Sequence, residues 1–369
     1  MPEAPNSLGL ADELTSHTIS RRTFLKIALA VGGGSLFPRW ITAAEIQGLP
    51  KPEIPPKPIQ PQQTVISVMP DFSADDFNAR KLPSEEITKF EDAIGARTHV
   101  VSVFVDMDRK PINPNIIDKI SQSGRAAMLN WEPRSYADPL DHARRFTAAA
   151  FTSGQHDSPL ESWAKMIRDS GVAVYLRLGY EMNGNWFPWG QKPEPFKTIW
   201  KHVVDKFKSA GADNARWIFS PNHWPSPEKI ADYYPGDEYV DVVGADAYDK
   251  YSIYWKNAWH WTQLNFPPEA LFNHINYYLK QVAPHKPLMV CEIGSGRESG
   301  RDDWLAAAIF KCLQQGITGL NYFQYLKETD WRLTDPAQLK TLRTITGSRY
   351  FLSDTASLSD IDSTLLKVW

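Results

Sequence analysis

The stretch that decides the fold is Val172-Ala173-Val174-Tyr175-Leu176-Arg177-Leu178-Gly179-Tyr180-Glu181. Its apolar run from Val172 to Leu178 is typical of a strand buried on both faces, and the carboxylate of Glu181 follows at the carboxyl end. A second stretch repeats this plan: Pro287-Leu288-Met289-Val290-Cys291-Glu292-Ile293-Gly294-Ser295. Two buried strands that each deliver a glutamate predict an α/β fold with chemistry at the strand ends.

Short apolar segments alternate with amphipathic helical patterns from residue 64 onward. The predicted strands are Thr64–Phe72, His99–Met107, Arg125–Glu132, Ala173–Glu181, Arg216–Asn222, Val240–Tyr248, Pro287–Ser295 and Gly316–Leu326. The predicted helices are Ser84–Gly95, Asn115–Gly124, Pro159–Gly171, Pro195–Gly211, Pro227–Tyr234, Pro268–Val282, Asp302–Gln315 and Asp335–Ile345. Many helices open with Ser, Asp or Pro and several end on Gly, as helix termini do. The alternation predicts a single (β/α)₈ TIM barrel over residues 62–350, followed by a short C-terminal tail over 351–369.

The N-terminal residues predict an export signal. Ser20-Arg21-Arg22-Thr23-Phe24-Leu25-Lys26 precedes an apolar run from Ile27 to Phe37 that is too short to span a bilayer. Paired arginines before a weakly apolar run are typical of the twin-arginine signal, with a candidate cleavage site at Thr42-Ala43-Ala44. A chance Arg-Arg pair is the alternative. We therefore assign residues 1–44 to the signal and 45–61 to a Pro-rich linker, and expect the twin-arginine export machinery as a partner.

Composition narrows the class of protein. The formal net charge of -3 gives no basic surface for nucleic acid. The two cysteines, Cys291 and Cys312, are expected as small core residues, and no Cys/His cluster has the spacing of a metal site, so we expect no metal and no cofactor. The 14 tryptophans indicate either a Trp-rich core or surfaces on which sugar rings stack.

Glu181 and Glu292 fall at the ends of the fourth and seventh predicted strands. Active sites of such barrels lie at the C-terminal face, so both carboxyls should point into one bowl. Retaining glycosidases use two carboxyl groups about 5–5.5 Å apart, one as acid/base and one as nucleophile. A single strand-end glutamate is more often a capping or salt-bridging residue, but the pair predicts a glycosidase.

Other polar residues share the predicted strand ends. Arg177 lies on the same strand face as Glu181, where its charge could hold a neighbouring carboxylate ionised; an ordinary ion pair in the barrel core is the alternative. Asp246 and Tyr248 share a face at the end of the sixth strand. Tyr248 could orient the nucleophile, or it could be a core tyrosine.

Aromatic residues in the predicted loops are candidate sugar platforms, although at least one is expected to serve only in loop packing. They are Trp186, Trp189, Trp224 and Trp331. Asn222 and the segment Asp330-Trp331-Arg332 could bind sugar hydroxyls at the same rim. His223 is the one histidine that follows a predicted strand at the rim; the others are expected to be surface or satisfied residues.

The order of these motifs resembles glycoside hydrolase family 26, a retaining (β/α)₈ family best known for endo-β-1,4-mannanases. The resemblance covers about residues 106–332 and rests on the following segments: Asn130-Trp131-Glu132-Pro133, Phe151 to Asp157, Tyr180 to Gly184 with Trp186 to Trp189, Ser220-Pro221-Asn222, Tyr234 to Asp241, Asp246-Ala247-Tyr248, Glu292-Ile293-Gly294 and Asp330-Trp331-Arg332.

The resemblance implies roles for individual residues. Glu181 matches the acid/base, Glu292 the nucleophile, Tyr248 the tyrosine that touches the nucleophile, and Trp186 the aromatic residue near the cleavage point. One position departs from the family, because mannanases usually have a histidine where this chain has Tyr180. This departure leaves the two-carboxylate mechanism intact and puts mannan specificity in question.

The leading hypothesis is an exported, monomeric, retaining endo-β-glycosidase of a β-1,4-mannan-type polysaccharide, acting in the periplasm or outside the cell, or held at the membrane by an uncleaved signal. The same mechanism on a mixed-linkage β-glucan, a β-1,3-xylan or a bacterial exopolysaccharide is the second hypothesis. A glycan-binding barrel without catalysis is the third, although such a barrel would be expected to have lost one of the two glutamates.

Overall fold

The computed structural model describes residues 54–71, 82–108, 116–136, 145–224, 226–255, 258–263, 268, 271–297, 299–327 and 329–368. The predicted export signal, and the linker up to residue 53, lie outside these residues. In the described part of the chain, no helix is long and apolar enough to cross a membrane.

Eight parallel strands close into a barrel. They are β1 (Val65–Pro70), β2 (Val100–Asp106), β3 (Ala126–Glu132), β4 (Val174–Leu178), β5 (Ala215–Phe219), β6 (Val242–Tyr248), β9 (Leu288–Gly294) and β10 (Ile317–Gln324). Each barrel strand pairs with the barrel strands that come before and after it along the chain, and β1 closes the ring by pairing with β10. Nearly all strand residues are buried, as the apolar runs predict. The predicted (β/α)₈ barrel is therefore confirmed.

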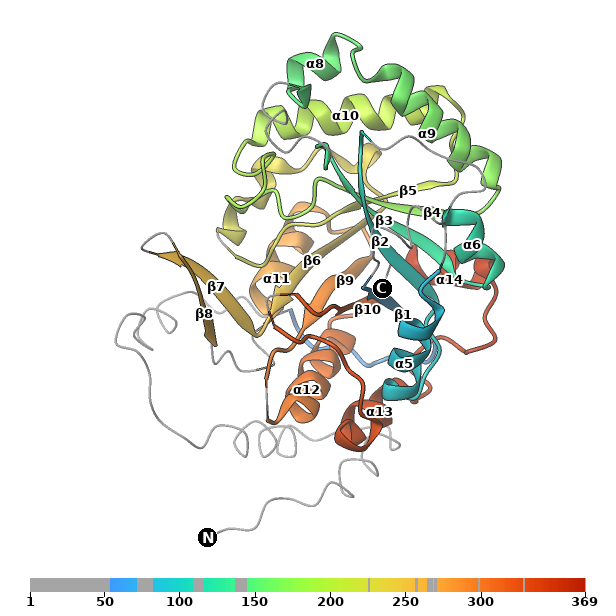
Figure 1. Ribbon diagram of the computed structural model, residues 1–369, viewed down its shortest axis with the longest axis vertical. Coiled ribbons are helices and arrows are strands. Elements are labelled where there is room, and N and C mark those ends of the chain that lie inside the picture. The colour runs from blue at the N-terminus through green and yellow to red at the C-terminus, as the bar shows by residue number, and fades with distance from the viewer. Residues whose placement is uncertain are drawn as a thin grey trace.

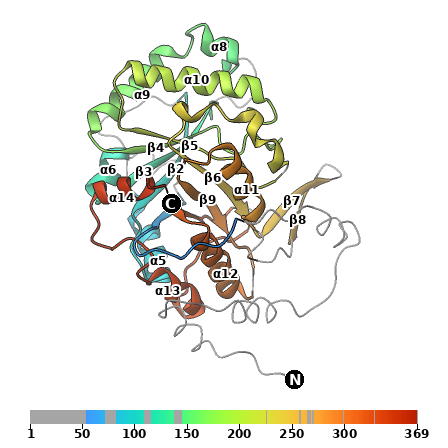
Figure 2. The ribbon, with the colours of Figure 1, turned by 180° about the vertical axis from the view of Figure 1, so that it is seen from behind.

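Helices surround the barrel between the strands (Figure 1). They are α5 (Ser84–Ile94), α6 (Ile116–Gln122), the short α8 (Ala148–Thr152), α9 (Asp157–Ser170), α10 (Pro193–Ser209), α11 (Asn273–Val282), α12 (Arg301–Gln314) and α13 (Lys340–Thr346). Helices α9 and α10 lie on the side of β4 and β5, and α12 and α13 lie on the opposite side of the barrel (Figures 1 and 2). The helix predicted over Pro227–Tyr234 is a 3₁₀ helix, η1 (Pro227–Tyr233).

The segment expected to be a C-terminal tail contains a helix, α14 (Leu358–Leu365), that closes the N-terminal end of the barrel. Ile361 and Leu365 are buried in one cluster with Val65, Val242 and Met289, which lie near the starts of their strands. Burying a side chain of this size contributes about 1.5–3 kcal/mol. The helix is also held by Asp362, which accepts hydrogen bonds from the side chains of Tyr175 and Arg216.

A two-stranded antiparallel hairpin, which the sequence analysis did not predict, follows β6. It consists of β7 (Lys250–Trp255) and β8 (Ala258–Gln263), and it projects from the side of the barrel (Figures 1 and 2). The residue before it, Asp249, is fully buried and accepts hydrogen bonds from Ser295 Oγ at 2.7 Å and Arg297 Nε at 2.8 Å. The start of the hairpin is thereby fixed to the loop that follows β9.

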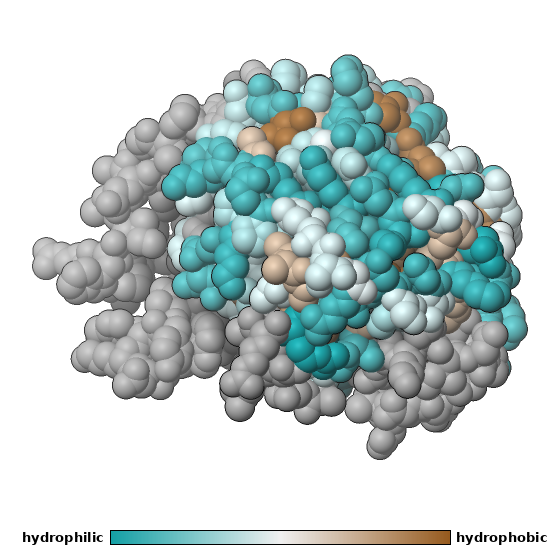
Figure 3. All heavy atoms as spheres, turned by 90° about the horizontal axis from the view of Figure 1, so that it is seen from above, coloured by the Kyte–Doolittle hydropathy of each residue, from teal (hydrophilic) through white to brown (hydrophobic). Residues whose placement is uncertain are grey.

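The surface seen along the long axis of the molecule is mostly hydrophilic, with apolar residues in small separate patches (Figure 3). Large exposed apolar side chains are few among the described residues, and Trp224, at 55% exposure, is the most exposed of them. Single exposed apolar residues are common on soluble proteins, whereas large contiguous patches mark interaction sites.

Candidate active site

The carboxyl ends of β4 and β9 carry the two glutamates. Glu292 lies within β9, whereas β4 ends at Leu178, three residues before Glu181. Gly179 and Glu181 both have φ of 53°, in the left-handed region that a non-glycine residue adopts at a cost of order 1–3 kcal/mol. The backbone N–H of Glu181 donates to Ser220 O at 2.7 Å, which holds this turn in place. The turn, rather than strand alternation, brings Glu181 over the barrel.

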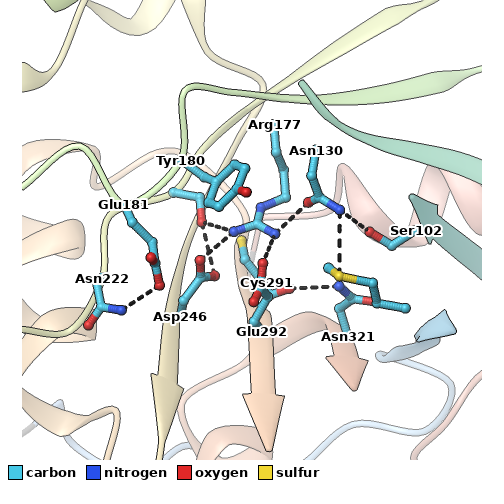
Figure 4. A network of polar contacts seen from close by, with 12 residues as sticks. Ser102, Asn130, Arg177, Tyr180, Glu181, Asn222, Asp246, Cys291, Glu292 and Asn321 are labelled. Atoms are coloured by element: carbon cyan, nitrogen blue, oxygen red, sulfur yellow. Dashed lines mark hydrogen bonds and ion pairs between the residues drawn. The ribbon is translucent and has the colours of Figure 1, made fainter. Parts of the chain in front are cut away.

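Both carboxylate oxygens of Glu292 accept hydrogen bonds. Arg177 Nη1 donates to Oε1 at 2.7 Å, and the Tyr248 hydroxyl donates to Oε2 (Figure 4 shows the arginine contact). Burial first, and then the negative charges of Glu292 and Asp246, raise the pKa of Tyr248 well above its ordinary value. Tyr248 therefore remains a hydrogen-bond donor. This arrangement fixes the orientation of the Glu292 carboxylate.

Arg177 is the centre of a polar layer inside the barrel. Its two terminal nitrogens donate to Asn130 Oδ1 at 2.5 Å, Ser220 Oγ at 2.9 Å and Asp246 Oδ2 at 2.5 Å, in addition to Glu292 (Figure 4). The side chains of Arg177 and Asp246 have no exposed surface. A buried guanidinium is tolerated only when it is paired in this way. The layer thus forms a rigid polar floor beneath the two glutamates.

Glu181 is held from the opposite side. Trp186 Nε1 donates to its Oε2 and Asn222 Nδ2 donates to its Oε1, both at 2.5 Å. Burial first, and then repulsion by Glu292, raise the pKa of Glu181 to about 7, while the two hydrogen bonds and Arg177 act in the opposite direction. A carboxyl group whose pKa is raised in this direction can carry a proton near neutral pH and can serve as both acid and base.

The electrostatic balance of the site favours two different carboxyl roles. One cation, Arg177, faces Glu181, Asp246 and Glu292. Burial, together with repulsion from the other two carboxylates, also raises the pKa of Asp246, although its contact with Arg177 opposes this. Environments that separate the proton affinities of neighbouring carboxyls are the mark of acid/base assignments in glycosidases.

Two of the four predicted sugar platforms lie at the surface. The indoles of Trp186 and Trp224 are nearly parallel, with an angle of 5° between their planes and 6.4 Å between ring centroids. Trp186 is partly buried because its N–H is bound to Glu181, and Trp224 is the more exposed of the two.

The other two predicted platforms, Trp189 and Trp331, are buried in this structure. Trp189 is 4% exposed, stacks against Phe187 and donates its N–H to Tyr180 O. Trp331 is 3% exposed and packs against Tyr248, whose hydroxyl holds Glu292. These indoles shape the walls of the site because the loops fold back onto the barrel.

Arg177 and Asp246, which were predicted to bind substrate, have no exposed side-chain surface and bind each other. Tyr180 is only 4% exposed, and its hydroxyl donates to Glu132 Oε1 at 2.5 Å. Glu132 is in turn paired with Arg134 through two hydrogen bonds of 2.9 Å. Asn222, 6% exposed, acts on Glu181. These four predicted contact residues position other groups.

His223, the histidine at the rim, is partly buried. Its Nδ1 is 3.2 Å from Asp246 O, and burial lowers its pKa to about 4, so the ring is neutral at physiological pH. No group of three or more His, Cys, Asp or Glu side chains in the described ranges could hold a metal ion. Cys291 and Cys312 are free and buried.

Sequence reasoning missed the roles of Asn130, Ser220 and Glu132. Asn130 and Ser220 bind the guanidinium of Arg177, and Glu132 binds the hydroxyl of Tyr180. The signal was present in part, because all three residues lie at or next to the carboxyl ends of β3 and β5. Which partners they meet depends on barrel closure.

The structure is a (β/α)₈ barrel with two glutamates at the C-terminal ends of its strands. One glutamate lies where it can carry a proton, and the other is held by an arginine and a tyrosine. These features define the glycoside hydrolase class of barrels. Comparisons with known proteins agree with this class. Residues 155–276 match the model of Glycosyl hydrolase family 26. The predicted resemblance to family 26 and its β-mannanases is thus confirmed.

Individual relatives give the same result. The chain is 25% identical over 282 residues to "Endoglucanase H" of Acetivibrio thermocellus, which covers 72% of this chain and 29% of the relative. It is 28% identical over 169 residues to a "Mannan endo-1,4-beta-mannosidase" of Bacillus subtilis, covering 42% of this chain and 40% of the relative. The chain therefore spans well under half the length of these relatives.

The fold is that of solved family members. The catalytic domain of a GH26 endo-β-1,4-mannanase from Bacillus sp. JAMB-750 superposes with a TM-score of 0.60 at 18% identity, covering 83% of this chain and 90% of that domain.

Proposed function

We propose that this protein is a retaining endo-β-glycosidase that hydrolyses a β-linked polysaccharide, with a β-1,4-mannan-type chain as the leading substrate. The observation that carries the proposal is the different environment of the two glutamates. Glu292 accepts hydrogen bonds on both oxygens from Arg177 and Tyr248, whereas the pKa of Glu181 is raised to about 7.

In the first step, Glu292 Oε attacks the anomeric carbon while Glu181 gives its proton to the glycosidic oxygen. The bond to the leaving sugar breaks, and a glycosyl ester forms on Glu292. This ester removes the negative charge that repels Glu181, so the pKa of Glu181 falls. Glu181, now a carboxylate, takes a proton from water, and the oxygen of that water replaces Glu292 on the anomeric carbon.

A mixed-linkage or other β-glucan is the second candidate substrate. Two observations favour it: Tyr180 stands where family mannanases usually have a histidine, and one of the similar proteins is named as an endoglucanase. β-1,3-Xylan and bacterial exopolysaccharides remain further alternatives. We also propose that the protein acts outside the cytoplasm after export by the twin-arginine machinery, on the evidence of Arg21-Arg22 and the apolar run that follows.

Release of reducing sugar from mannan, glucomannan, lichenan and β-1,3-xylan identifies the substrate. NMR of the first product then reads its anomeric configuration before mutarotation, and we expect retention. A 2-fluoro sugar with an activated leaving group should label Glu292. An inverted first product, or labelling of another residue by an active enzyme, would refute the double-displacement mechanism. No activity on any β-glycan would favour the non-catalytic binding barrel.

A further inference from the structure

We propose that Trp224 forms a binding site for the second sugar on the leaving-group side of the cleaved bond, and so makes the enzyme selective for chains that extend beyond the first leaving sugar. The inference rests on the proposed function and extends it to substrate length. It follows from the position of Trp224 relative to Glu181 and Glu292.

The direction of the leaving group is set by the acid. A general acid protonates the oxygen that departs with the leaving sugar, so the leaving sugar lies on the side of Glu181 that faces away from the nucleophile. Asn222 lies on that side. In Figure 4, Glu181 stands between Asn222 and the group formed by Asp246, Arg177 and Glu292.

Trp224 lies on the same side of Glu181 as Asn222, further from the nucleophile. Asn222 donates through Nδ2 to Glu181, while its Oδ1 accepts the backbone N–H of Trp224 at 3.0 Å. Trp186 is bound directly to the carboxyl of Glu181, whereas Trp224 is linked to that carboxyl through Asn222 and lies beside the ring of Trp186. The first leaving sugar therefore belongs beside Trp186, and Trp224 lies one step further from the cleavage point.

The state of the Trp224 side chain fits a stacking site. The two ring planes are nearly parallel, at 5°, and their centroids are 6.4 Å apart, near the upper end of the 4.5–7 Å range of aromatic pairs. Trp224 remains 55% exposed, although its backbone is held by Asn222. An indole that is fixed at its base and open to solvent can bind the C–H face of a sugar with little loss of conformational entropy.

An indole face suits an uncharged pyranose, so the expected ligand is an uncharged sugar ring in a β-linked chain. The site should also accept a free sugar chain while the glycosyl ester exists. In that case the acceptor hydroxyl gives its proton to Glu181 and its oxygen bonds to the anomeric carbon as the ester bond to Glu292 breaks and releases the Glu292 carboxylate. The enzyme then transfers the glycosyl unit to sugar in place of water.

The test compares wild type and Trp224→Ala on two substrates with the same glycone, taken from the β-glycan that the wild type cleaves. The first is an aryl glycoside, whose small leaving group ends beside Trp186. The second is an oligosaccharide cleaved with two sugars on the leaving side. We expect kcat/KM for the oligosaccharide to fall about tenfold, the effect of losing one stacking contact. The value for the aryl glycoside should change less than twofold.

Leu326→Ala is the matched control, since Leu326 is also a large exposed apolar residue, at 54%, in the segment after β10. It should leave both substrates unchanged. Transfer to a labelled disaccharide acceptor should decrease in Trp224→Ala and be preserved in part by Trp224→Phe. Equal losses on both substrates, no loss on either, or a loss that follows the number of sugars on the glycone side would overturn the site.

If the wild type is inactive, this result counts against the proposed function, but the sugar-binding site at Trp224 can still be tested by measuring binding. Calorimetry with the same disaccharide should then detect binding to wild type that is weakened in Trp224→Ala. Equal affinity of the two proteins, or no binding to either, would overturn the inference by this route.

Discussion

The hydroxyl of Tyr180 donates a 2.5 Å hydrogen bond to Glu132 at the end of the neighbouring strand, and its ring lies over the guanidinium of Arg177, 4.9 Å from the ring centre. Tyr180 stands where family mannanases usually have a histidine, so these contacts of the tyrosine hydroxyl and ring are particular to this chain. It joins the glutamate–arginine pair of Glu132 and Arg134 at the rim to the buried arginine that holds Glu292.

Tyr180→Phe should lower the free energy of unfolding by about 1.5–3 kcal/mol, the usual contribution of a hydrogen bond to a charged group. Because the ring loses its anchor above Arg177, kcat should also fall several-fold. Tyr175→Phe is the control, since its hydroxyl donates to Asp362 at the other end of the barrel. The control should show the stability loss in chemical denaturation without the loss of kcat. Equal kcat values in the two variants would contradict a role for Tyr180 in the site.

Activity should decrease as pH rises through about 7, because Glu181 must carry a proton to act as the acid and its pKa is raised to about 7. Asn222→Ala removes a hydrogen bond that stabilises the carboxylate form and therefore raises this pKa. The alkaline limb of kcat/KM against pH should move to higher pH in this variant. An unchanged limb, or a shift to lower pH, would assign the limb to another group.

Glu181→Ala should reduce kcat on the natural polysaccharide by about 10²–10⁴-fold, the usual contribution of general acid/base catalysis. The first step on an aryl glycoside with a good leaving group needs no acid and should largely survive. Stopped-flow measurement of aryl alcohol release separates this step from hydrolysis of the glycosyl ester. Equal losses in the first step for both substrates would remove Glu181 from the role of acid.

Arg177→Met should destabilise the protein by about 3–5 kcal/mol, because it leaves Asp246 and Glu292 buried without their common cation. Thermal and urea denaturation measure this loss. The double variant Arg177→Met with Asp246→Asn should recover part of the stability without activity, since Glu292 still lacks the guanidinium that binds its Oε1. A double variant no more stable than the single one would show that charge pairing is not the main role of Arg177.

Replacing Arg21 and Arg22 together by Lys should leave a folded precursor in the cytoplasm, because the twin-arginine pathway reads the arginines and not only their charge. Cell fractionation with an activity assay locates the protein. A single replacement serves as the milder control. Normal export of the double variant would favour a general secretory signal.

The sequence was sufficient for the barrel because parallel strands buried on both faces leave an apolar pattern, and the two glutamates follow those patterns directly. It was not sufficient for the hairpin β7–β8. The sequence from Lys250 to Gln263 contains no glycine, the residue that marks many two-residue turns. Helix α14 did carry a signal, because Ser357 and Asp360 form a capping box before the buried Ile361.

The candidate site was predictable as a set of residues and less so as a set of roles. Exposure cannot be read from a loop position, and Trp189 and Trp224 show this, since one is buried and the other open. The turn at Glu181 also escaped prediction, because strand alternation gives no sign of a left-handed non-glycine residue. Both features depend on contacts between segments that are distant along the chain.

Helix α14 has a consequence for how the molecule is made. It is synthesised after all eight barrel strands, yet Ile361 and Leu365 complete the apolar layer at the base of that barrel. A chain still being translated cannot seal this layer and exposes it until residues 358–365 have left the ribosome. Before that point, folding on the ribosome should leave the base of the barrel uncovered. A transporter that accepts only folded proteins would therefore bind this protein only after helix α14 has packed against the barrel.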